Sequence, residues 1–450
     1  MNADPVWHVT PRPACLGKVQ GTLHADIAIV GGGLTGLSTA YHLLVREPTL
    51  HVVIMDAGHV GSGASTRNTG MLGPGVGQNL LGLIDRVGDD AAESLYRRTL
   101  SAVTLVRDLV AKENLACDLT MGGQIHWARS IAGRRRLAAQ AHWLNERGLP
   151  AEMLDDESLR DCVCLPETAG RGRGLPAALR LPDAGILDPG KLVARLAIAA
   201  QLRGAQIFEG SMVSALAGGG PGGKVSLSLV GGGKVLADQT VIATAGYTGT
   251  LGRLIGRVIP MQIQAVASEP IPTSLLEQIG WHRREGIIET QRVFNYFRLS
   301  AENRLIFGGG APRPYQPRDR QIQALPQSTQ QTLANAFFTT FPDLATEGIR
   351  ITHGWSGTIG YVINGIPIIG RSHDNPNILH AVGWSGHGIA MGVAAGSWIA
   401  DLIDRAEDGG GAVGALDLFG RYPTRVPFTR LHGLAIRAGG AAMRMMDRFE

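Results

Sequence analysis

Residues 31 to 36 have the G-x-G-x-x-G spacing of a turn that binds a dinucleotide. A short β-rich run ends at Val30 and helical spacing continues after residue 36, so these glycines stand where a strand passes into a helix. In such a turn Gly31 permits the tight bend, Gly33 lets the backbone approach a pyrophosphate, and Gly36 lets the helix pack closely on the strand. The spacing therefore predicts a phosphate site.

Two neighbouring features predict the same ligand. The helix that follows the turn begins near Leu34 and Thr35, and its N-terminus supplies free N–H groups and a positive dipole end for the phosphates. Asp56 ends the next strand twenty residues after Gly36, where a carboxylate can accept hydrogen bonds from a ribose hydroxyl. These features indicate a dinucleotide and leave open whether it is NAD or FAD.

The loop after Asp56 reads AGHVGSGASTRNTG over residues 57 to 70. It resembles the extended FAD signature of the D-amino-acid oxidase superfamily, and its ASTRNTG part is similar to the branch that contains gamma-glutamylputrescine oxidoreductase. The resemblance covers nearly the whole chain and implies FAD. Because residues 61 to 70 contain no Cys or His for covalent attachment, we expect the FAD to be bound noncovalently. The implied cofactor contacts in this loop are Ala57, Gly63, Ala64, Ser65, Arg67, Asn68, Thr69 and Gly70.

Three later segments resemble the same family. Residues 241 to 246, VIATAG, are similar to its buried strand and cofactor turn, and Val213 falls where the family holds the adenine with a backbone group. Residues 383 to 390, GWSGHGIA, resemble its G-x-S-G-H-G segment. Small residues there let N–H groups approach the flavin, and a helix N-terminus favours the anionic reduced form. The implied contacts are Ala245, Gly246, Gly357, Gly386, His387, Gly388 and Ile389.

The resemblance implies oxidation of the C–N bond of a small amine or amino acid. Hydride transfer from the carbon next to a neutral amine to flavin N5 gives an imine, which water hydrolyses. This route demands no dedicated acid or base. Tyr296 and Trp355 are candidates to wall the substrate cavity, with ordinary core packing as the alternative. His387 is a candidate either to contact the flavin or to act as a base.

The electron acceptor stays open at this point. Sarcosine oxidases of the superfamily place a lysine near the flavin in a strand that matches residues 304 to 310, and Ile306 stands at the matching position here. A dehydrogenase that passes electrons to another acceptor therefore competes with an oxidase that uses oxygen. Asn364 also stands where family members usually carry an aspartate. A non-catalytic flavoprotein subunit is a further alternative.

Composition excludes some partners and suggests others. The net charge of +4 gives no argument for nucleic-acid binding, and four cysteines without zinc or disulfide spacing predict no metal site and a reducing, cytoplasmic compartment. Residues 1 to 25 lack the apolar run of a secretory signal. Residues 419 to 450 are basic and apolar, so this tail could contact the inner face of a membrane or a subunit, or pack on the body. Its glycines argue against one continuous helix.

These segments predict an α/β fold of two domains, because 450 residues exceed what one core usually holds. A Rossmann-type, glutathione-reductase-like FAD domain is interrupted by an α+β substrate domain built on an antiparallel sheet, which the alternation in residues 257 to 311 indicates. Residues 88 to 165 look helical, and Asp188 is the expected N-cap of a helix that ends at Gln201. The expected division is 24–88, 150–255 and 350–410 for FAD, 89–149 and 256–349 for substrate, and 411–450 for the tail.

Overall fold

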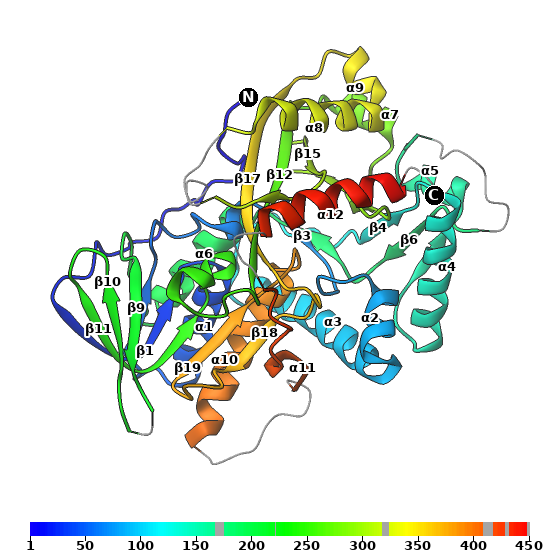
Figure 1. Cartoon of the computed structure of the whole chain (residues 1–450). Helices are drawn as coiled ribbons and strands as arrows, with labels where there is room; N and C mark the ends of the chain where they lie inside the picture. The colour runs from blue at the N-terminus through cyan, green and yellow to red at the C-terminus, as the bar shows by residue number, and fades with distance from the viewer. Residues whose placement is uncertain (167–174, 221, 317–323, 408–416, 428–431, 448–450) are drawn as a thin grey trace.

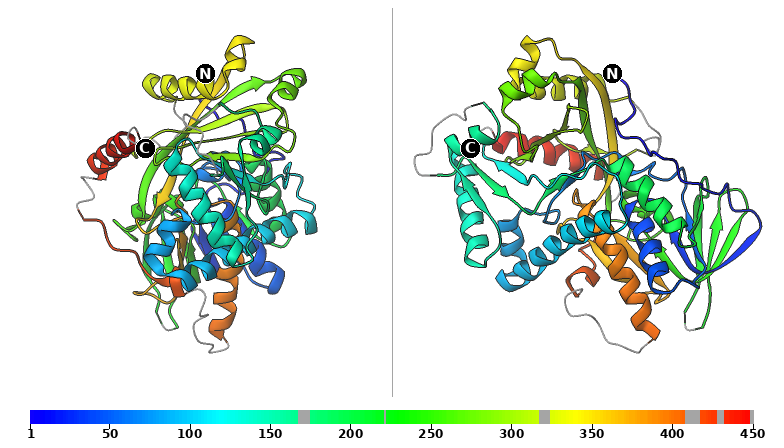
Figure 2. Two further views of the ribbon diagram at one scale, coloured as in Figure 1. Left: turned by 90° about the vertical axis from the view of Figure 1, so that its right-hand side faces the viewer. Right: turned by 180° about the vertical axis from the view of Figure 1, so that it is seen from behind.

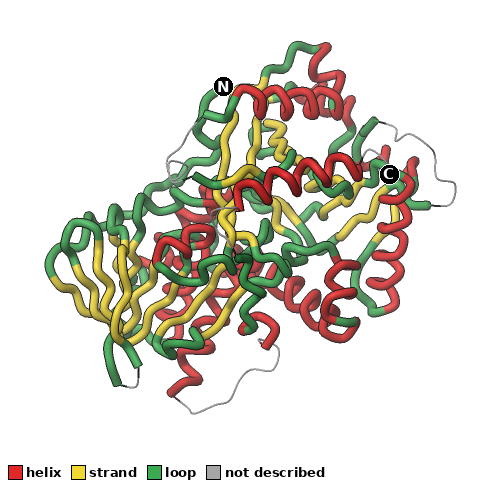
Figure 3. Tube along the Cα trace, in the orientation of Figure 1, coloured by secondary structure: helices red, strands yellow, loops and turns green. Residues whose placement is uncertain are grey.

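The computed structural model describes residues 1–166, 175–220, 222–316, 324–407, 417–427 and 432–447. Two large β-sheets lie side by side, with helices around both (Figures 1 and 3). This arrangement confirms the predicted α/β fold with a nucleotide-binding part and a second, largely antiparallel part. Among the helices in these ranges, none combines the length and the apolar character that a bilayer crossing requires.

The first sheet contains the predicted βαβ unit. Its strands are β1 (Thr22–Val30), β2 (Val52–Met55), β8 (Gln206–Phe208), β9 (Val213–Gly218), β10 (Val225–Leu229), β11 (Lys234–Ile242), β18 (Ile368–Arg371) and β19 (Ile378–Val382). Strand β1 is parallel to both β2 and β11, and residues 27 to 30 are buried, as expected of an apolar strand covered on both faces. The sheet order is β18-β19-β11-β1-β2-β8, with β10 and β9 beyond β11.

Helices pack on this sheet and on one another. They are α1 (Leu34–Arg46), α3 (Asp89–Lys112), α6 (Pro189–Gln201) and α10 (Ala390–Glu407). Helix α1 packs between α6 and α10. The Asp188 carboxylate accepts a hydrogen bond from Lys191 N at 2.9 Å, and α6 ends at Gln201, so the predicted N-cap and helix are confirmed.

The second sheet carries the other domain. Its strands are β4 (Gln124–Trp127), β5 (Glu152–Leu154), β6 (Ala178–Leu181), β12 (Ile259–Pro270), β13 (Gly286–Glu289), β14 (Asn295–Leu299), β15 (Arg304–Gly309), β16 (Arg313–Pro314) and β17 (Ile351–Tyr361). Residues 257 to 311 supply the central antiparallel strands, as predicted, although β13 is parallel to β4. The helices of this part are α2 (Leu80–Val87), α4 (Ile131–Glu146), α5 (Asp156–Cys162), α7 (Thr273–Ile279), α8 (Gln327–Thr340) and α9 (Pro342–Thr346).

Sheet membership differs from the expected division in three places. Strands β5 and β6, within residues 150 to 181, hydrogen-bond in the second sheet, and so does β17, although the sequence division assigned both regions to the FAD domain. Residues 88 to 165 also contain β4 and β5 between their helices. Short apolar runs look alike in either sheet, because their pairing partners are distant in the sequence.

Short elements complete the fold. They are β3 (Met71–Leu72), β7 (Gly185–Ile186), the 3-10 helices η1 (Ala64–Thr66) and η2 (Ala245–Leu251), α11 (Asp417–Gly420) and α12 (His432–Asp447). Helix α12 is continuous through Gly433, Gly439 and Gly440, so the expectation that these glycines would interrupt it is wrong. It packs on β16 and lies on the face turned to the viewer in Figure 1. In the left-hand view of Figure 2 it lies at the left edge of the molecule. Tertiary packing here outweighs low helix propensity.

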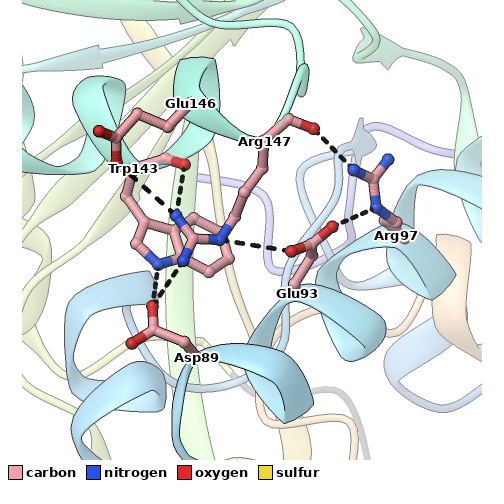
Figure 4. Close-up of polar contacts among 6 residues, drawn as sticks. All are labelled: Asp89, Glu93, Arg97, Trp143, Glu146 and Arg147. Atoms are coloured by element: carbon pink, nitrogen blue, oxygen red, sulfur yellow. Dashed lines mark hydrogen bonds and ion pairs between the residues drawn. The ribbon is translucent and has the colours of Figure 1, made fainter.

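One polar cluster fixes α3 against α4 (Figure 4). Arg147 lies 4.1 Å above the Trp143 ring and pairs with Asp89 at 2.9 Å and Glu93 at 3.3 Å. Trp143 Nε1 also donates to Asp89, at 2.5 Å, and Arg97 donates to the Arg147 carbonyl at 2.6 Å. The cluster therefore joins the start of α3 to the end of α4.

Candidate functional site

A cavity of about 1430 Å³ is lined by residues of both sheets. It extends from the turn after β1, along the loop of residues 56 to 70, to the turn before α10 and to one face of α12. Its volume exceeds the roughly 300–1,000 Å³ typical of a pocket for one small ligand. One cavity can therefore hold a large cofactor and a substrate together.

The glycines of the first turn are each required by a close contact. A Cβ atom at Gly36 would lie 1.9 Å from the Gly31 carbonyl oxygen, and one at Gly31, where φ is +116°, would lie 2.6 Å from the Ala243 oxygen. A Cβ at Gly33 would lie 2.7 Å from Ser65 Oγ. Ser65 Oγ in turn accepts a hydrogen bond from Leu34 N at 3.0 Å, so this helix N–H is not free for a phosphate. The turn is open at Gly31, Gly33, Leu34 and Thr35, which line the cavity.

Asp56 stands at the nucleotide end of the cavity. Its two carboxylate oxygens accept hydrogen bonds from Gly32 N and Gly58 N, each at 2.8 Å. Burial raises the pKa of this carboxyl above its usual value, while the two backbone N–H groups oppose the shift. Ala57 and Val213 line the same end. A carboxylate fixed in this way can accept a further hydrogen bond from a ribose hydroxyl.

The loop after Asp56 is held in place by hydrogen bonds from one of its own side chains, that of Asn68. Asn68 Nδ2 donates to the carbonyls of Ala64 and Ser65, and Asn68 Oδ1 accepts from Gly70 N at 2.8 Å. The loop residues that line the cavity include Gly63, Ala64, Ser65, Arg67, Asn68, Thr69 and Gly70. The loop thus presents backbone and one cation to the cavity.

Arg67 is supported from behind by β17. Its guanidinium lines the cavity and forms no hydrogen bond or ion pair with a described residue, and burial lowers its pKa. Trp355 Nε1 donates to the Arg67 carbonyl at 3.2 Å, and a Cβ at Gly357 would lie 2.9 Å from Arg67 Cβ. Trp355 is 1% exposed and does not line the cavity, so its expected place in the cavity wall is wrong. Its side chain lies on the same face of β17 as Gly357 but packs in an apolar cluster with Trp7 and Ile306.

Ile306 itself is fully buried in that same apolar cluster. It does not line the cavity. Among the lining residues in the described ranges, no lysine occurs, and the guanidinium cations are Arg67, Arg136 and Arg292.

Two histidines meet at the far end of the cavity. His387 lies in the turn before α10, where Ser385 (φ +48°) and Gly386 (φ +102°) adopt left-handed conformations. His126 comes from β4, and burial is the main cause that lowers the pKa of each imidazole to about 4, with His387 adding to the effect on His126. Both side chains are neutral at pH 7. An imidazole with so low a pKa is a weak base, which favours a flavin contact over a base role for His387.

His126 was missed in the sequence because its strand interrupts a region that reads as helix. The alternation of polar Gln124 and His126 with buried Ile125 and Trp127 is the signal that could have identified it.

Tyr296 lines the cavity as predicted for a wall residue. A Cβ at Gly308, on the neighbouring strand, would lie 2.4 Å from Tyr296 Cε2, so the ring lies over that glycine. Burial raises the pKa of the Tyr296 hydroxyl to about 12, and it therefore stays protonated.

The remaining predicted residues divide into two groups. Ala245, Gly386, Gly388 and Ile389 line the cavity. Gly36, Gly246, Gly357 and Trp355 do not, and they shape it from behind instead; a Cβ at Gly246, for example, would lie 2.7 Å from the Ile359 carbonyl oxygen. Direct contact of any of these residues with a cofactor stays a prediction. No group of three or more His, Cys, Asp or Glu side chains suited to a metal occurs in the part of the chain described here.

The chain matches one protein family over most of its length. The model of the DAO family, described as FAD dependent oxidoreductase, matches residues 26–402. Gamma-glutamylputrescine oxidoreductase of Escherichia coli strain K12 is 27% identical over 95% of this chain and 94% of its own length. The crystal structure of glycine oxidase from Geobacillus kaustophilus has a TM-score of 0.71 at 22% identity and covers 90% of this chain and all of that one. The L-proline dehydrogenase structure from P. horikoshii has a TM-score of 0.68 at 20% identity, covering 88% of this chain and 98% of the other.

The residues in the cavity fit FAD. Glycines 31 and 33 leave the turn open to a diphosphate, and Asp56 and Val213 stand at one end, where the adenosine would lie. The glycine-rich turn with His387 stands at the other end, and small residues there leave space for a ring. An elongated dinucleotide is the ligand that such a cavity suits.

Proposed function

We propose, on the premise that this chain belongs to the DAO family of FAD-dependent oxidoreductases, that it oxidises the C–N bond of a small amine or amino acid. The observation that carries this proposal is the continuity of the cavity. The end at Asp56 and the compartment beside Tyr296, His126 and His387 belong to one continuous cavity. A cofactor and a substrate placed there would touch.

Bound FAD supplies the two-electron acceptor, which takes a hydride from the carbon next to the amine. The protein binds and orients the substrate and excludes water from the compartment. His126 and His387 are neutral at pH 7, so they add no positive charge that would repel a substrate cation or its product. The protonated Tyr296 hydroxyl can donate a hydrogen bond to a substrate oxygen or nitrogen. The resulting imine is then hydrolysed by water to a carbonyl compound and ammonia, or to a carbonyl compound and an amine where the substrate is a secondary amine.

A dehydrogenase that uses an acceptor other than oxygen is the second candidate. Among the described residues that line the cavity, Arg occurs but Lys does not, so the lysine expected of a sarcosine oxidase is not found there. This observation supports the second candidate. A flavoprotein subunit without catalysis is the third. Contact of the C-terminal segment with a membrane or another subunit stays a prediction from the sequence.

Anaerobic mixing of the purified yellow protein with a panel of amines and amino acids tests the proposal. Bleaching of the flavin absorption near ~450 nm by a panel member is expected. Repeating the productive reaction in air and measuring peroxide separates an oxidase from a dehydrogenase. A flavin that no amine or amino acid reduces would support the non-catalytic alternative.

A further inference from the structure

Helix α12 forms part of the cavity with one face. The residues of this face recur every three or four positions and are His432, Ala435, Ile436, Gly439, Gly440 and Met443. On the other side of the helix Leu434 and Met445 are exposed, and Met443 at the cavity face is itself 44% exposed. Figure 2 shows α12 at the edge of the molecule, with the remaining chain on its inner side. It is thus an outer wall of the cavity.

Contacts at its middle and at its C-terminal end hold this wall in place. Asp447 accepts hydrogen bonds from Arg292 N at 3.0 Å and from Val293 N at 2.9 Å. A Cβ at Gly440 would lie 3.0 Å from Ala311 Cβ, so a glycine is needed for the helix to lie this close to the strand region of β16. The helix is therefore seated on the sheet by specific contacts.

The compartment beneath α12 is apolar. Pro312 and Val293, which flank the contacts just described, line it together with Met261, Ile263, Phe294 and Tyr296. The charged side chains nearby, Glu289, Arg292 and Arg136, already have partners, and Arg136 donates to the Thr290 carbonyl at 3.3 Å. Glu289 accepts from Arg129 at 3.2 Å and from Asn295 Nδ2 at 2.8 Å, and Arg292 pairs with Asp447 at 3.7 Å. A charged substrate group would lose its hydration there without an unpaired opposite charge to compensate it.

We propose that α12 selects the substrate, and that this substrate is an amine or amino acid with an apolar side group of several carbon atoms. The proposal rests on the proposed function and specifies its substrate class. Glycine-sized substrates would leave the compartment beneath α12 unfilled. Burial of each added methylene should improve binding about three- to fourfold until the group reaches the helix.

Gly439→Leu is the decisive variant. A Cβ at Gly439 meets nothing within 4 Å, and this position lines the cavity, so the leucine side chain would extend into the compartment without a clash at its base. Ala438→Leu is the matched control, because Ala438 is the next residue on the same helix, is exposed and does not line the cavity. Both variants add the same leucine to α12.

The first measurement is the rate of flavin reduction by straight-chain amines and amino acids of increasing length, under anaerobic conditions. In the unchanged protein and in Ala438→Leu, the rate constant of flavin reduction divided by the substrate dissociation constant should rise with each methylene. In Gly439→Leu it should fall at least tenfold for the longest members and stay within about twofold for the shortest.

A second measurement needs no reaction. Straight-chain carboxylates from acetate to heptanoate, which carry no amine to oxidise, are titrated into the FAD-loaded protein and followed by the flavin absorption. The dissociation constant should fall with chain length in the unchanged protein, and Gly439→Leu should end this trend at a shorter chain. If this pattern holds while no amine reduces the flavin, the substrate compartment is as proposed and the oxidation is wrong. If chain length has no effect, if no carboxylate binds, or if Gly439→Leu and Ala438→Leu behave alike, the inference is overturned.

Discussion

Replacing Gly36 by alanine tests how tightly the nucleotide turn is built. The added methyl carbon would lie 1.9 Å from the Gly31 carbonyl oxygen and 3.1 Å from Ile29 Cγ2. Gly31 cannot yield freely, because its N–H donates to the Met55 carbonyl at 2.8 Å across the two central strands. The start of α1 must therefore move away from β1 by about 1 Å or more to restore a normal carbon–oxygen separation near 3.5 Å.

Two contributions to the stability of this variant have opposite signs: helix propensity and steric overpacking. Alanine is better than glycine in a helix by about 1 kcal/mol, whereas overpacking at a tight contact costs about 1–3 kcal/mol and occasionally more. A contact as short as 1.9 Å belongs at the upper end of that cost, so steric strain should prevail. If the geometry that binds FAD carries about 1–3 kcal/mol of extra strain, the dissociation constant rises roughly 5- to 150-fold.

Titration of the apoprotein with FAD, followed by quenching of flavin fluorescence, measures this change. Gly249→Ala is the control, since Gly249 lies in the helical turn η2 and a Cβ there meets nothing within 4 Å. It should bind FAD as the unchanged protein does. Equal FAD affinity of Gly36→Ala and Gly249→Ala would show that the turn adapts, and the close-packing argument for this glycine would be wrong.

Four further predictions concern single side chains. His126 and His387 have pKa values of about 4 in the fold and about 6.5 when unfolded, so the stability that they contribute as neutral groups is complete above pH 6.5 and is lost as the pH falls toward 4. The free energy of unfolding of the apoprotein in urea should therefore be lower at pH 5 than at pH 7 by up to about 2 kcal/mol for each histidine, and the difference should be smaller in a His387→Gln variant. Trp355→Phe leaves a buried carbonyl of the cofactor loop without its donor and should cost about 1–3 kcal/mol in unfolding, with weaker FAD binding in the titration above. Arg147→Ala should lower the unfolding free energy by about 1–2 kcal/mol in urea titration and leave FAD affinity unchanged, because its partly exposed contacts join only α3 and α4 (Figure 4). Asp447→Ala should speed hydrogen exchange in α12 while exchange in the first sheet stays constant.

The nucleotide turn could be predicted from the sequence because its determinants are local. Gly31 to Gly36, the strands on either side and the N-cap Asp188 each act on residues close to them in the chain, and each lies where the pattern placed it. Residues 57 to 70 are also local, since Asn68 closes the loop on itself.

Long-range pairing explains what the sequence could not predict. The side of β17 on which Trp355 lies depends on register with β12, where Trp355 pairs with Ala265, ninety residues away in the sequence. A one-residue shift would move the indole to the other face. The place of β5 and β6 and the continuity of α12 likewise depend on contacts with distant strands, whereas propensity alone argued against a helix through Gly439 and Gly440.

Strand β17 also explains how a two-part molecule can hold one elongated ligand. At its middle Trp355 and Gly357 support Arg67, on the loop from the first sheet. At its end the Gly360 carbonyl accepts from Ser385 N at 3.0 Å, and Ser385 Oγ accepts from Val362 N at 3.0 Å, which fixes the turn that carries His387. The loop of residues 57 to 70 and the turn that carries His387 are thus both attached to one strand of the second sheet, within eight residues of each other. A β-strand is stiff over that length, so the separation of the two turns is set by its rise of roughly 3.3 Å per residue and not by a movable interface between domains.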